Sequence, residues 1–404
     1  MGRALAAARP GSWPAYLTFP RNADAIAALD GLRAAAILLV LARHAITPFR
    51  ETGEMFFPIL GWDAATPLVN GWIGVDLFFV LSGFLIARGL IRRFDATGTV
   101  SLQQYFARRA LRILPAYYAM LFVASAGLIP FFAVAPDMLG LRVAYHALFL
   151  QDYLPSNIVI AFWSLGVEEK FYIAAPFVLI PMLRLKRRQV QYAVLTALVL
   201  TPLAFRLNVM TGGAVVADYE TFFRTLRSPF HRGFDGLAVG VLAALLWLDR
   251  VRLTWLTDPR CAETLFWTGA AVIGWLWLRA PMLDAIDPFD RTFLQLVLAL
   301  AFGAVLLGVM AGGGPRHLLG AKALNPVAKL SYCLYLVHMA AIPAAIAGAE
   351  AFSGQFFPPT IPAFAVFIPI YLCASVLGAL VLHFGVEKPF LNPRIRPDVS
   401  AGRR

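Results

Sequence analysis

Two ionisable side chains lie on one face of the first long apolar segment of this 404-residue chain. Arg33 and His44 are eleven residues apart, which leaves only about 20° between them around an α-helix and about 16 Å along its axis. A neutral imidazole inside a protein can act as a general base. A second interpretation is that Arg33 extends to the membrane interface and His44 is a packing residue with an internal hydrogen bond. The spacing alone favours neither.

Asp76 follows in the second apolar segment, GWIGVDLFFVLSGFLIARG, at a depth similar to that of His44 in an antiparallel neighbour. A carboxylate there could hold the imidazole of His44 in one tautomer and stabilise its cation, as a general base requires. The alternatives are that Asp76 caps the start of its helix or pairs with Arg43.

Two adjacent carboxylates, Glu168 and Glu169, interrupt the apolar segment FWSLGVEEKFYIAAPF. Ionisable groups inside such a segment are costly unless they face a polar interior, so each is a candidate functional residue. We expect Glu168 to bind Arg33 or His44, or to accept hydrogen bonds from a hydroxylated substrate. The alternative is that both glutamates mark a helix start and face water, and the role of Glu169 stays open.

Three arginines lie close together in QQYFARRALRILPAYY. Arg109 and Arg112 are three residues apart and project from one helix face, with Arg108 beside them. Planar guanidiniums suit a phosphate-rich ligand because each offers bidentate donors. Ordinary anchoring of the helix by cytoplasmic cations is the alternative, and the spacing by itself favours that alternative.

Polar residues also recur in KLSYCLYLVHM, where Ser331, Tyr335 and His338 are four and three residues apart on one helix face. Such a stripe either lines an interior cavity or ties helices together, and both interpretations fit. In FHRGFDGLAVG, the i, i+3 spacing of Arg232 and Asp235 favours a structural ion pair beside a glycine-rich helix contact.

The elements that must position these side chains are membrane-spanning helices. Hydrophobic residues make up 60% of the chain and charged residues 14%, and the mean hydropathy is +0.70. These values exclude disordered, coiled-coil and disulfide-rich proteins and disfavour an ordinary soluble enzyme. A spanning helix needs about 20 mostly apolar residues. We therefore predict an all-α polytopic membrane protein with about ten spans, near 29–48, 71–91, 110–132, 161–183, 190–207, 234–248, 262–280, 292–311, 330–350 and 362–386, and a short re-entrant or interfacial piece at 143–151.

The net charge of +12 follows the pattern of membrane orientation. Basic residues concentrate in alternating connections, which the positive-inside rule assigns to the cytoplasm. Both termini are then expected in the cytoplasm, the number of spans is even, and the protein is placed in the inner (plasma) membrane. The predicted division is a cytoplasmic arm at 1–26, a transmembrane domain at 27–390 and a cytoplasmic tail at 391–404.

Several partner classes are not expected from the sequence. The basic residues come without a nucleic-acid-binding motif, so we expect no nucleic acid partner. The three cysteines, Cys261, Cys333 and Cys373, have no CxxC spacing, and the histidines are scattered over different segments. We therefore expect no disulfide framework, no metal site and no bound cofactor.

Seven segments, in this order, resemble the acyltransferase 3 family of integral membrane O-acyltransferases: GLRAAAILLVLARH, GVDLFFVLSGFLI, RRALRILPAYY, FWSLGVEEKFY, FDGLAVG, KLSYCLYLVH and VEKPF. The resemblance covers nearly the whole chain. It implies ten transmembrane helices and transfer of an acyl group from cytoplasmic acyl-CoA, with acetyl as the expected group. The implied acceptor is a hydroxyl of a saccharide or a similar exported or cell-surface molecule. The hydrolase-like domain of some members is not found in the sequence, which implies acceptor chemistry in the membrane part or in a separate partner protein.

The resemblance also assigns residues by position. The family's Arg-x10-His signature matches Arg33 and His44, and its Arg-x-x-Arg element matches Arg109 and Arg112. Its Trp-Ser-Leu…Glu segment matches Trp163, Ser164 and Glu168. Lys170 departs from the family, in which glutamine is common after the Glu pair, and we expect Lys170 to pair with Glu169.

These assignments predict a mechanism. Acyl-CoA, the donor substrate, binds with its phosphates near Arg108, Arg109 and Arg112, and neutral His44 takes the proton of an acceptor hydroxyl that attacks the thioester. A transient acyl-enzyme is an alternative within this scheme. The expected further catalytic residues are Arg33, Glu168 and Asp76, and the expected substrate-binding residues are Trp163, Ser164, Tyr335 and His338.

The competing functional class is a multi-span transporter or flippase for a glycan or lipid, which performs no covalent chemistry. In such a protein the buried charges serve a proton or substrate pathway. Inverted repeats and broken helices at matching positions would mark a transporter, and the sequence shows neither clearly.

Overall fold

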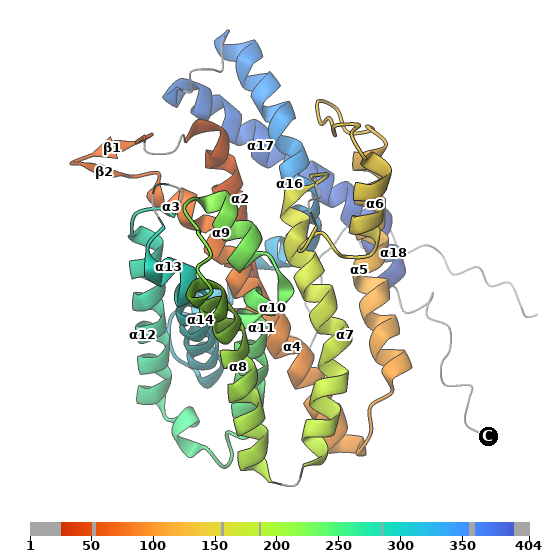
Figure 1. The fold of residues 1–404 in the computed structure, drawn as a ribbon, viewed down its shortest axis with the longest axis vertical. Helices are drawn as coiled ribbons and strands as arrows, with labels where there is room; N and C mark the ends of the chain where they lie inside the picture. Colours follow the sequence, from red (N-terminus) through yellow and green to blue (C-terminus); the bar gives the residue numbers. More distant parts are fainter. Residues whose placement is uncertain are drawn as a thin grey trace, which may run out of the picture.

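The computed structural model describes residues 26–50, 54–154, 157–185, 187–282, 284, 286–354 and 360–391. Residues 1–25 of the predicted cytoplasmic arm and residues 392–404 of the predicted tail lie outside the described residues. Across the described part the chain is a bundle of long helices joined by short turns and small helices (Figure 1).

Each of the ten predicted spans overlaps a helix of at least 14 residues. These helices are α2 (Ala27–Ile46), α4 (Ile73–Thr97), α5 (Leu102–Ser125), α7 (Trp163–Arg184), α8 (Arg188–Thr211), α11 (Asp235–Leu248), α12 (Pro259–Leu278), α14 (Leu294–Ala311), α16 (Leu324–Ser353) and α17 (Ile361–Leu382).

Small elements connect the long helices. They are α3 (Thr66–Val69), α6 (Leu139–Ala147), α9 (Tyr219–Phe222), α10 (Phe230–Gly233), α13 (Pro288–Thr292), α15 (Arg316–Leu319), α18 (Lys388–Leu391), and the 3-10 turns η1 (Thr47–Phe49), η2 (Asn70–Trp72), η3 (Ile160–Phe162) and η5 (Thr254–Thr257). Two further turns, η4 (Phe223–Arg227) and η6 (His383–Glu387), are π-helical. The predicted short piece at 143–151 overlaps the short helix α6.

Seven helical stretches in the described part are long and apolar enough to cross a membrane, which indicates a multi-pass membrane protein. They contain α2, α4, α8, α12, α14, α16 and α17. The other three predicted spans differ for physical reasons. Helix α11 has only 14 residues, and charged side chains interrupt α5 at Arg109 and Arg112 and α7 at Glu168 and Lys170.

Helix α5 has different ends from those predicted at 110–132. It begins at Leu102 because the Ser101 hydroxyl accepts a hydrogen bond from the backbone N–H of Gln104 at 3.3 Å, an N-cap that extends the helix through the arginines. It ends at Ser125, two residues before Gly127, whose φ of 67° is left-handed. Arg109 and Arg112 therefore lie within a regular helix.

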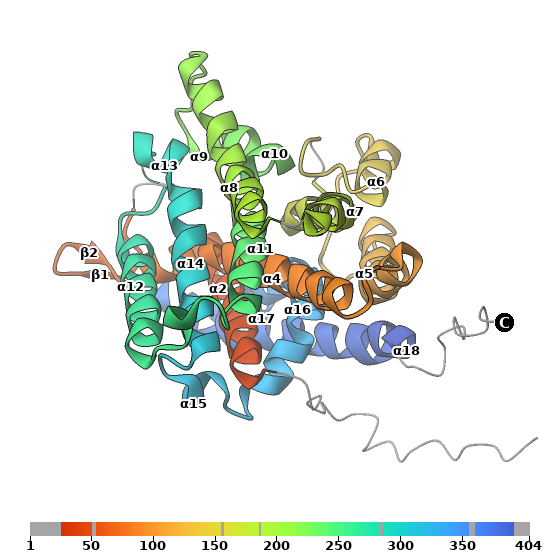
Figure 2. The same ribbon diagram turned by 90° about the horizontal axis from the view of Figure 1, so that it is seen from below.

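Helix α4 occupies the middle of the bundle (Figure 2). Helices α12 and α14 lie on one side of it, and α5, α6 and α7 lie on the other. Glycines allow its closest approach, which is to α11. A Cβ added at Gly83 would clash with the carbonyl oxygen of Leu237, and one added at Gly240 would clash with that of Val80. This backbone contact depends on small residues, as is usual between helices in membranes.

The connection between α2 and α4 is held by a buried carboxylate. It contains a hairpin of β1 (Pro58–Ile59) and β2 (Trp62–Asp63), paired antiparallel (Figure 1). Burial by itself would raise the pKa of Asp63. Hydrogen bonds from the backbone N–H groups of Phe57 and Ala65, each 2.9 Å, and from Arg50 Nε at 2.8 Å outweigh it, so that the pKa of Asp63 is lowered. The ionised carboxylate therefore shapes this connection.

We expect Gly83→Ala and Gly240→Ala to destabilise the bundle. Each adds a methyl group against a backbone carbonyl, and such overpacking costs about 1–3 kcal/mol. The free energy of unfolding of the purified protein in detergent measures this. Gly89→Ala, on the same helix as Gly83, is the matched control because an added Cβ there meets nothing within 4 Å. Equal stability of Gly83→Ala and Gly89→Ala would contradict the assigned helix contact.

Candidate active site

His44 lies beside a second histidine, His338, across the contact between α2 and α16. The His44 Nδ1 atom is 2.9 Å from the carbonyl oxygen of Val40 and 3.2 Å from His338 Nε2. The ring centroids are 4.8 Å apart with an interplanar angle of 61°. His338 is fully buried and His44 is half-buried. The sequence singled out both residues, and only the packing of α2 on α16 reveals that they touch.

Arg33 lies seven residues into α2 and shares its surroundings with two arginines of α5. The charges of Arg109 and Arg112 both act on Arg33, and so does the nearby carboxylate of Asp30. We call Arg33, Arg109 and Arg112 the arginine cluster. The three predicted cations are therefore brought together from two helices, at a level about 16 Å from His44 along α2 by the helical rise.

Within the arginine cluster, Arg109 and Arg112 have different neighbours. The Arg109 guanidinium lies over the ring of Tyr172, 5.8 Å from its centroid. Arg112 Nη1 lies 3.7 Å from Glu387 Oε1, and 38% of the Arg112 side chain is exposed. Arg112 therefore retains donors that a ligand can reach. Arg108 is exposed on the same turn of α5.

The carboxylate of Glu387 contacts three other side chains, and no role was assigned to it from the sequence. Besides Arg112, its carboxylate accepts hydrogen bonds from His383 Nδ1 at 2.6 Å and from the Cys333 thiol at 3.3 Å. The π-helical turn η6 carries both His383 and Glu387. These donor atoms lie within 4.8 Å of one another, a set that zinc accepts. Both hydrogen bonds go to Oε2, and Oε1 is buried without a hydrogen-bond partner among the described residues.

Glu168 is held by neutral groups. Its carboxylate accepts a hydrogen bond from the Ser82 hydroxyl of α4 at 2.8 Å and from the Tyr172 hydroxyl at 3.2 Å. The predicted direct contact with Arg33 or His44 is replaced by these two hydroxyls, although the charges of Arg33 and Arg109 act on Glu168. Ser82 was not predicted, and nothing in its local sequence distinguishes it from a packing serine.

Lys170 pairs with Asp152 of a neighbouring loop, and the prediction that it pairs with Glu169 is wrong. Its ammonium group donates to the Asp152 carboxylate at 2.5 Å, to the carbonyl oxygen of Gly166 at 3.2 Å and to that of Phe149. The reason is geometric, since adjacent residues of a helix point about 100° apart. Lys170 thus fastens the 148–154 loop to α7.

Asp76 binds an arginine, Arg227, and this corrects the prediction that it orients His44. The two side chains form a two-point ion pair, with Nη2–Oδ2 at 2.8 Å and Nη1–Oδ1 at 3.3 Å. Both are buried. Neither predicted alternative, a helix cap or a pair with Arg43, is the contact observed. A guanidinium matches a carboxylate at two points and carries a permanent charge, so it is the stronger partner.

Arg227 is placed by an irregular turn and by two tryptophans. It ends the π-helical turn η4, and its guanidinium lies 4.7 Å from the ring centroid of Trp72 and 5.5 Å from that of Trp163. Such stacking stabilises a cation in an apolar bundle. The predicted substrate-binding residue Trp163 therefore packs on this ion pair, and Arg227 itself was missed because its partner is 151 positions away.

Ser164 and Tyr335 join α7 to α16. The two hydroxyl oxygens are 2.6 Å apart, and the Tyr335 hydroxyl also lies 2.7 Å from the carbonyl oxygen of Ala161. The Tyr335 ring centroid is 5.5 Å from that of His338. Ser331, in contrast, donates to Ala328 of its own helix. The predicted stripe thus ties helices together next to the histidine pair.

A second buried ion pair differs from the one predicted. Asp235 accepts hydrogen bonds from Arg206 at 2.7 and 2.8 Å, both side chains being buried. The predicted partner, Arg232, donates instead to the carbonyl oxygen of Thr225 at 2.7 Å. Arg206 comes from α8, so the pair fastens α8 to the start of α11 and does not lie within one helix.

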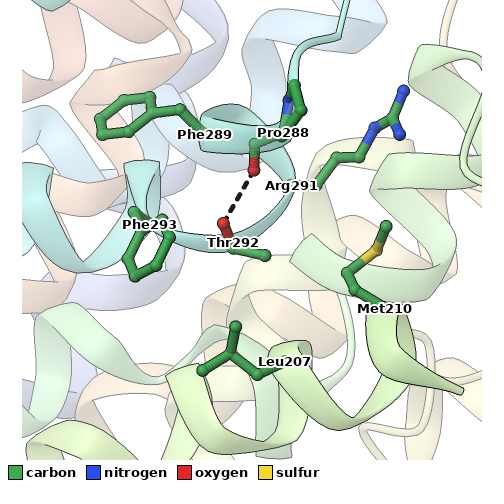
Figure 3. Close-up of a pocket in the computed structure, with 7 residues that line it drawn as sticks. All are labelled: Leu207, Met210, Pro288, Phe289, Arg291, Thr292 and Phe293. Atoms are coloured by element: carbon green, nitrogen blue, oxygen red, sulfur yellow. Dashed lines mark hydrogen bonds between the residues drawn. The ribbon is translucent and has the colours of Figure 1, made fainter.

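An open pocket of about 290 Å³ lies between α8 and α13 (Figure 3), and the carbonyl oxygen of Thr292 in its lining accepts a hydrogen bond from Arg206 Nε at 2.9 Å. Its lining is mostly apolar, with the guanidinium of Arg291 at one side and a Thr292 hydroxyl that donates to the carbonyl oxygen of Pro288 at 2.7 Å. The seven lining residues are Leu207, Met210, Pro288, Phe289, Arg291, Thr292 and Phe293. None is a predicted site residue, and none offers a group suited to act as a general base.

A family comparison covers most of the chain. The acyltransferase-domain model of the acyltransferase 3 family matches residues 26–384, which is most of the chain. The chain belongs to the acyltransferase 3 family. The histidine pair, the arginine cluster and the Asp76–Arg227 ion pair all fall within the matched range.

Three curated proteins are similar to this chain. A Bacillus subtilis protein named "Putative peptidoglycan O-acetyltransferase YrhL" is 27% identical over 92% of this chain and 56% of its own length. The peptidoglycan O-acetyltransferase OatA of Listeria monocytogenes is 31% identical over 39% of this chain and 25% of its own. A Staphylococcus aureus protein named "Putative O-acetyltransferase SACOL0978" is 30% identical over 39% of this chain and 25% of its own length.

The chain thus spans about half the length of the Bacillus relative and about a quarter of the other two. No solved structure matches this member of the acyltransferase 3 family.

We expect Asp76 and Arg227 to be far more sensitive to single than to paired replacement. Asp76→Leu or Arg227→Leu leaves one buried charge without its counter-ion, which costs about 3–5 kcal/mol in the free energy of unfolding, whereas the double variant loses both charges and recovers much of this. Thermal unfolding in detergent provides the comparison. Glu220→Ala, which breaks an exposed pair with Arg224, is the control and should change stability by less than about 1 kcal/mol. A double variant as unstable as the sum of the single variants would contradict the assigned pair.

Proposed function

We propose that this protein is a membrane O-acetyltransferase that moves an acetyl group from cytoplasmic acetyl-CoA to a hydroxyl of a cell-surface saccharide. The observation that carries the proposal is the arrangement on α2. A half-buried histidine in contact with a second histidine lies on the same helix face as a member of the arginine cluster. Membership of an acyltransferase family favours covalent transfer over the transporter alternative, and the relatives named as peptidoglycan O-acetyltransferases support a peptidoglycan-type acceptor.

The proposed topology places the arginine cluster where a cytoplasmic donor arrives. Ten helices alternate in direction, the basic connections lie on the cytoplasmic side and both termini lie there too. Arg33 is near the start of α2 and Arg109 near the start of α5, so both lie near that side. His44 is two residues from the end of α2, closer to the side where an exported acceptor is available.

The proposed donor site uses the arginine cluster for the phosphates of acetyl-CoA. The charges of Arg109 and Arg112 act unfavourably on that of Arg33, and a polyanionic ligand offsets this repulsion. Arg112, whose side chain is 38% exposed, bonds the phosphates directly. The pantetheine arm then extends into the bundle and carries the thioester toward His44.

The proposed chemical step is a direct acyl transfer. Neutral His44 accepts the proton of the acceptor hydroxyl while the hydroxyl oxygen forms a bond to the thioester carbonyl carbon. The carbon–sulfur bond then breaks, the sulfur takes the proton from His44, and the products are the acetyl ester and free CoA. Arg33 stabilises the donor, and Glu168, held by Ser82 and Tyr172, accepts hydrogen bonds from the acceptor's hydroxyls.

His44→Ala should abolish turnover of labelled acetyl-CoA with an acceptor glycan, since the base is removed. General acid–base catalysis contributes about 10²–10⁴-fold, so the loss should fall in that range. His317→Ala, an exposed histidine of α15, is the matched control and should retain full activity. Wild-type rates in folded His44→Ala protein would remove His44 from the chemistry.

Arg112→Ala should raise the KM for acetyl-CoA more than the KM for acceptor. A hydrogen bond to a charged group contributes about 1.5–3 kcal/mol, which predicts a rise of about 10- to 100-fold. Initial-rate kinetics with each substrate varied in turn give both constants. Arg92→Ala removes an exposed cation at the end of α4 and should leave both unchanged. Equal effects of Arg112→Ala on the two substrates would argue against a phosphate-binding role.

A further inference from the structure

His338 makes contacts that specify which of its nitrogens carries hydrogen. Its Nδ1 atom lies 2.8 Å from the carbonyl oxygen of Tyr335 and 3.1 Å from that of Leu334. Carbonyl oxygens only accept hydrogen bonds, so Nδ1 must be the donor. A neutral imidazole has one N–H group, and the Nε2 atom of His338 therefore presents a lone pair. That lone pair faces Nδ1 of His44 at 3.2 Å.

The same reasoning then specifies the tautomer of His44. Its Nδ1 atom lies between two acceptors, the lone pair of His338 and the carbonyl oxygen of Val40 at 2.9 Å. Hydrogen on Nδ1 satisfies both, whereas a lone pair there would face acceptors on both sides. The reverse assignment would also set the His338 Nδ1 lone pair against two carbonyl oxygens. Nε2 of His44 is consequently the nitrogen left with a lone pair.

We infer that His338 is a positioning residue for His44, which holds the hydrogen of His44 on Nδ1 and leaves Nε2 to accept the proton of the acceptor hydroxyl. This inference rests on the proposed function, in which His44 is the base. It gives a neutral imidazole the part that the sequence suggested for Asp76, whose carboxylate is engaged by Arg227. When Nε2 of His44 takes up a proton, the Nδ1–H group becomes a cationic donor and its bond to His338 becomes charge-assisted and stronger.

The rigidity of His338 suits this role. The residue is fully buried in α16, and backbone carbonyls of its own helix hold its ring. The ring also lies near that of Tyr335, whose hydroxyl is anchored to Ser164 and Ala161 of the neighbouring segment. Backbone groups therefore determine the orientation of His338, which in turn determines the orientation of His44.

A pair of similar variants tests the inference. The amide of glutamine reaches the position of a histidine Nε2 atom, whereas the amide of asparagine reaches only that of Nδ1. His338→Gln therefore keeps an acceptor for His44 Nδ1–H, and His338→Asn removes it. We expect kcat to fall about 10- to 100-fold in His338→Asn and less than about threefold in His338→Gln, while the KM for acetyl-CoA changes less than about twofold in both.

Histidine ¹⁵N spectroscopy gives a readout that does not depend on activity. In protein with ¹⁵N-labelled histidine, the ring nitrogens of His44 should report hydrogen on Nδ1 in the wild type and in His338→Gln, and a mixture of both tautomers in His338→Asn. His44→Ala assigns the signal. Hydrogen on Nε2 of His44 in the wild type, or an unchanged tautomer and kcat in His338→Asn, would overturn the inference. If His44→Ala kept full turnover, the proposed function would fail while the tautomer measurement would still report on the pair.

Discussion

An ionisable side chain in an apolar helix bundle needs a polar partner within the protein, and this requirement sorts the candidate residues. Two ion pairs, Asp76–Arg227 and Arg206–Asp235, each have two contacts and two buried side chains. Their charges are engaged in joining segments. His44 and Glu168, in contrast, make their described hydrogen bonds with neutral groups, the one with His338 and Val40, the other with Ser82 and Tyr172. In the proposed function, the groups whose partners carry no charge are the ones that exchange a proton or bind the acceptor.

Local departures from regular helix place residues that the site needs. The π-helical turn η4 ends at Arg227, and η6 carries His383 and Glu387 toward Arg112. Single-turn π-helices are frequent at functional sites because they redirect a side chain without ending the helix. Glycines have the complementary effect, since Gly83 and Gly240 allow α4 and α11 to touch through their backbones. The irregular turns thus hold side chains of α4 and α5, and the glycines bring α4 and α11 together.

Much of the fold follows from apolar run lengths, which is why all ten predicted spans coincide with helices. The errors are local. Helix α5 extends further at its start because Ser101 caps it, and Lys170 turns to Asp152 and not to its neighbour Glu169. The relative placement of candidate residues was predictable where they share one helix, as Arg33 and His44 do in α2. It was not predictable where a partner lies on another helix far along the chain, as with Asp76 and Arg227 or Ser82 and Glu168, because spacing carries no information about which helices pack together.

The most direct test of the account is a cryo-electron-microscopy structure of the protein bound to an acetyl-CoA analogue in which a methylene group replaces the thioester sulfur. The account predicts that the analogue's phosphates contact Arg112 within the arginine cluster and that its ketone lies beside Nε2 of His44, with room between them for a hydroxyl group. A ketone on the far side of α2 from His44, or phosphates bound away from the arginine cluster, would contradict it.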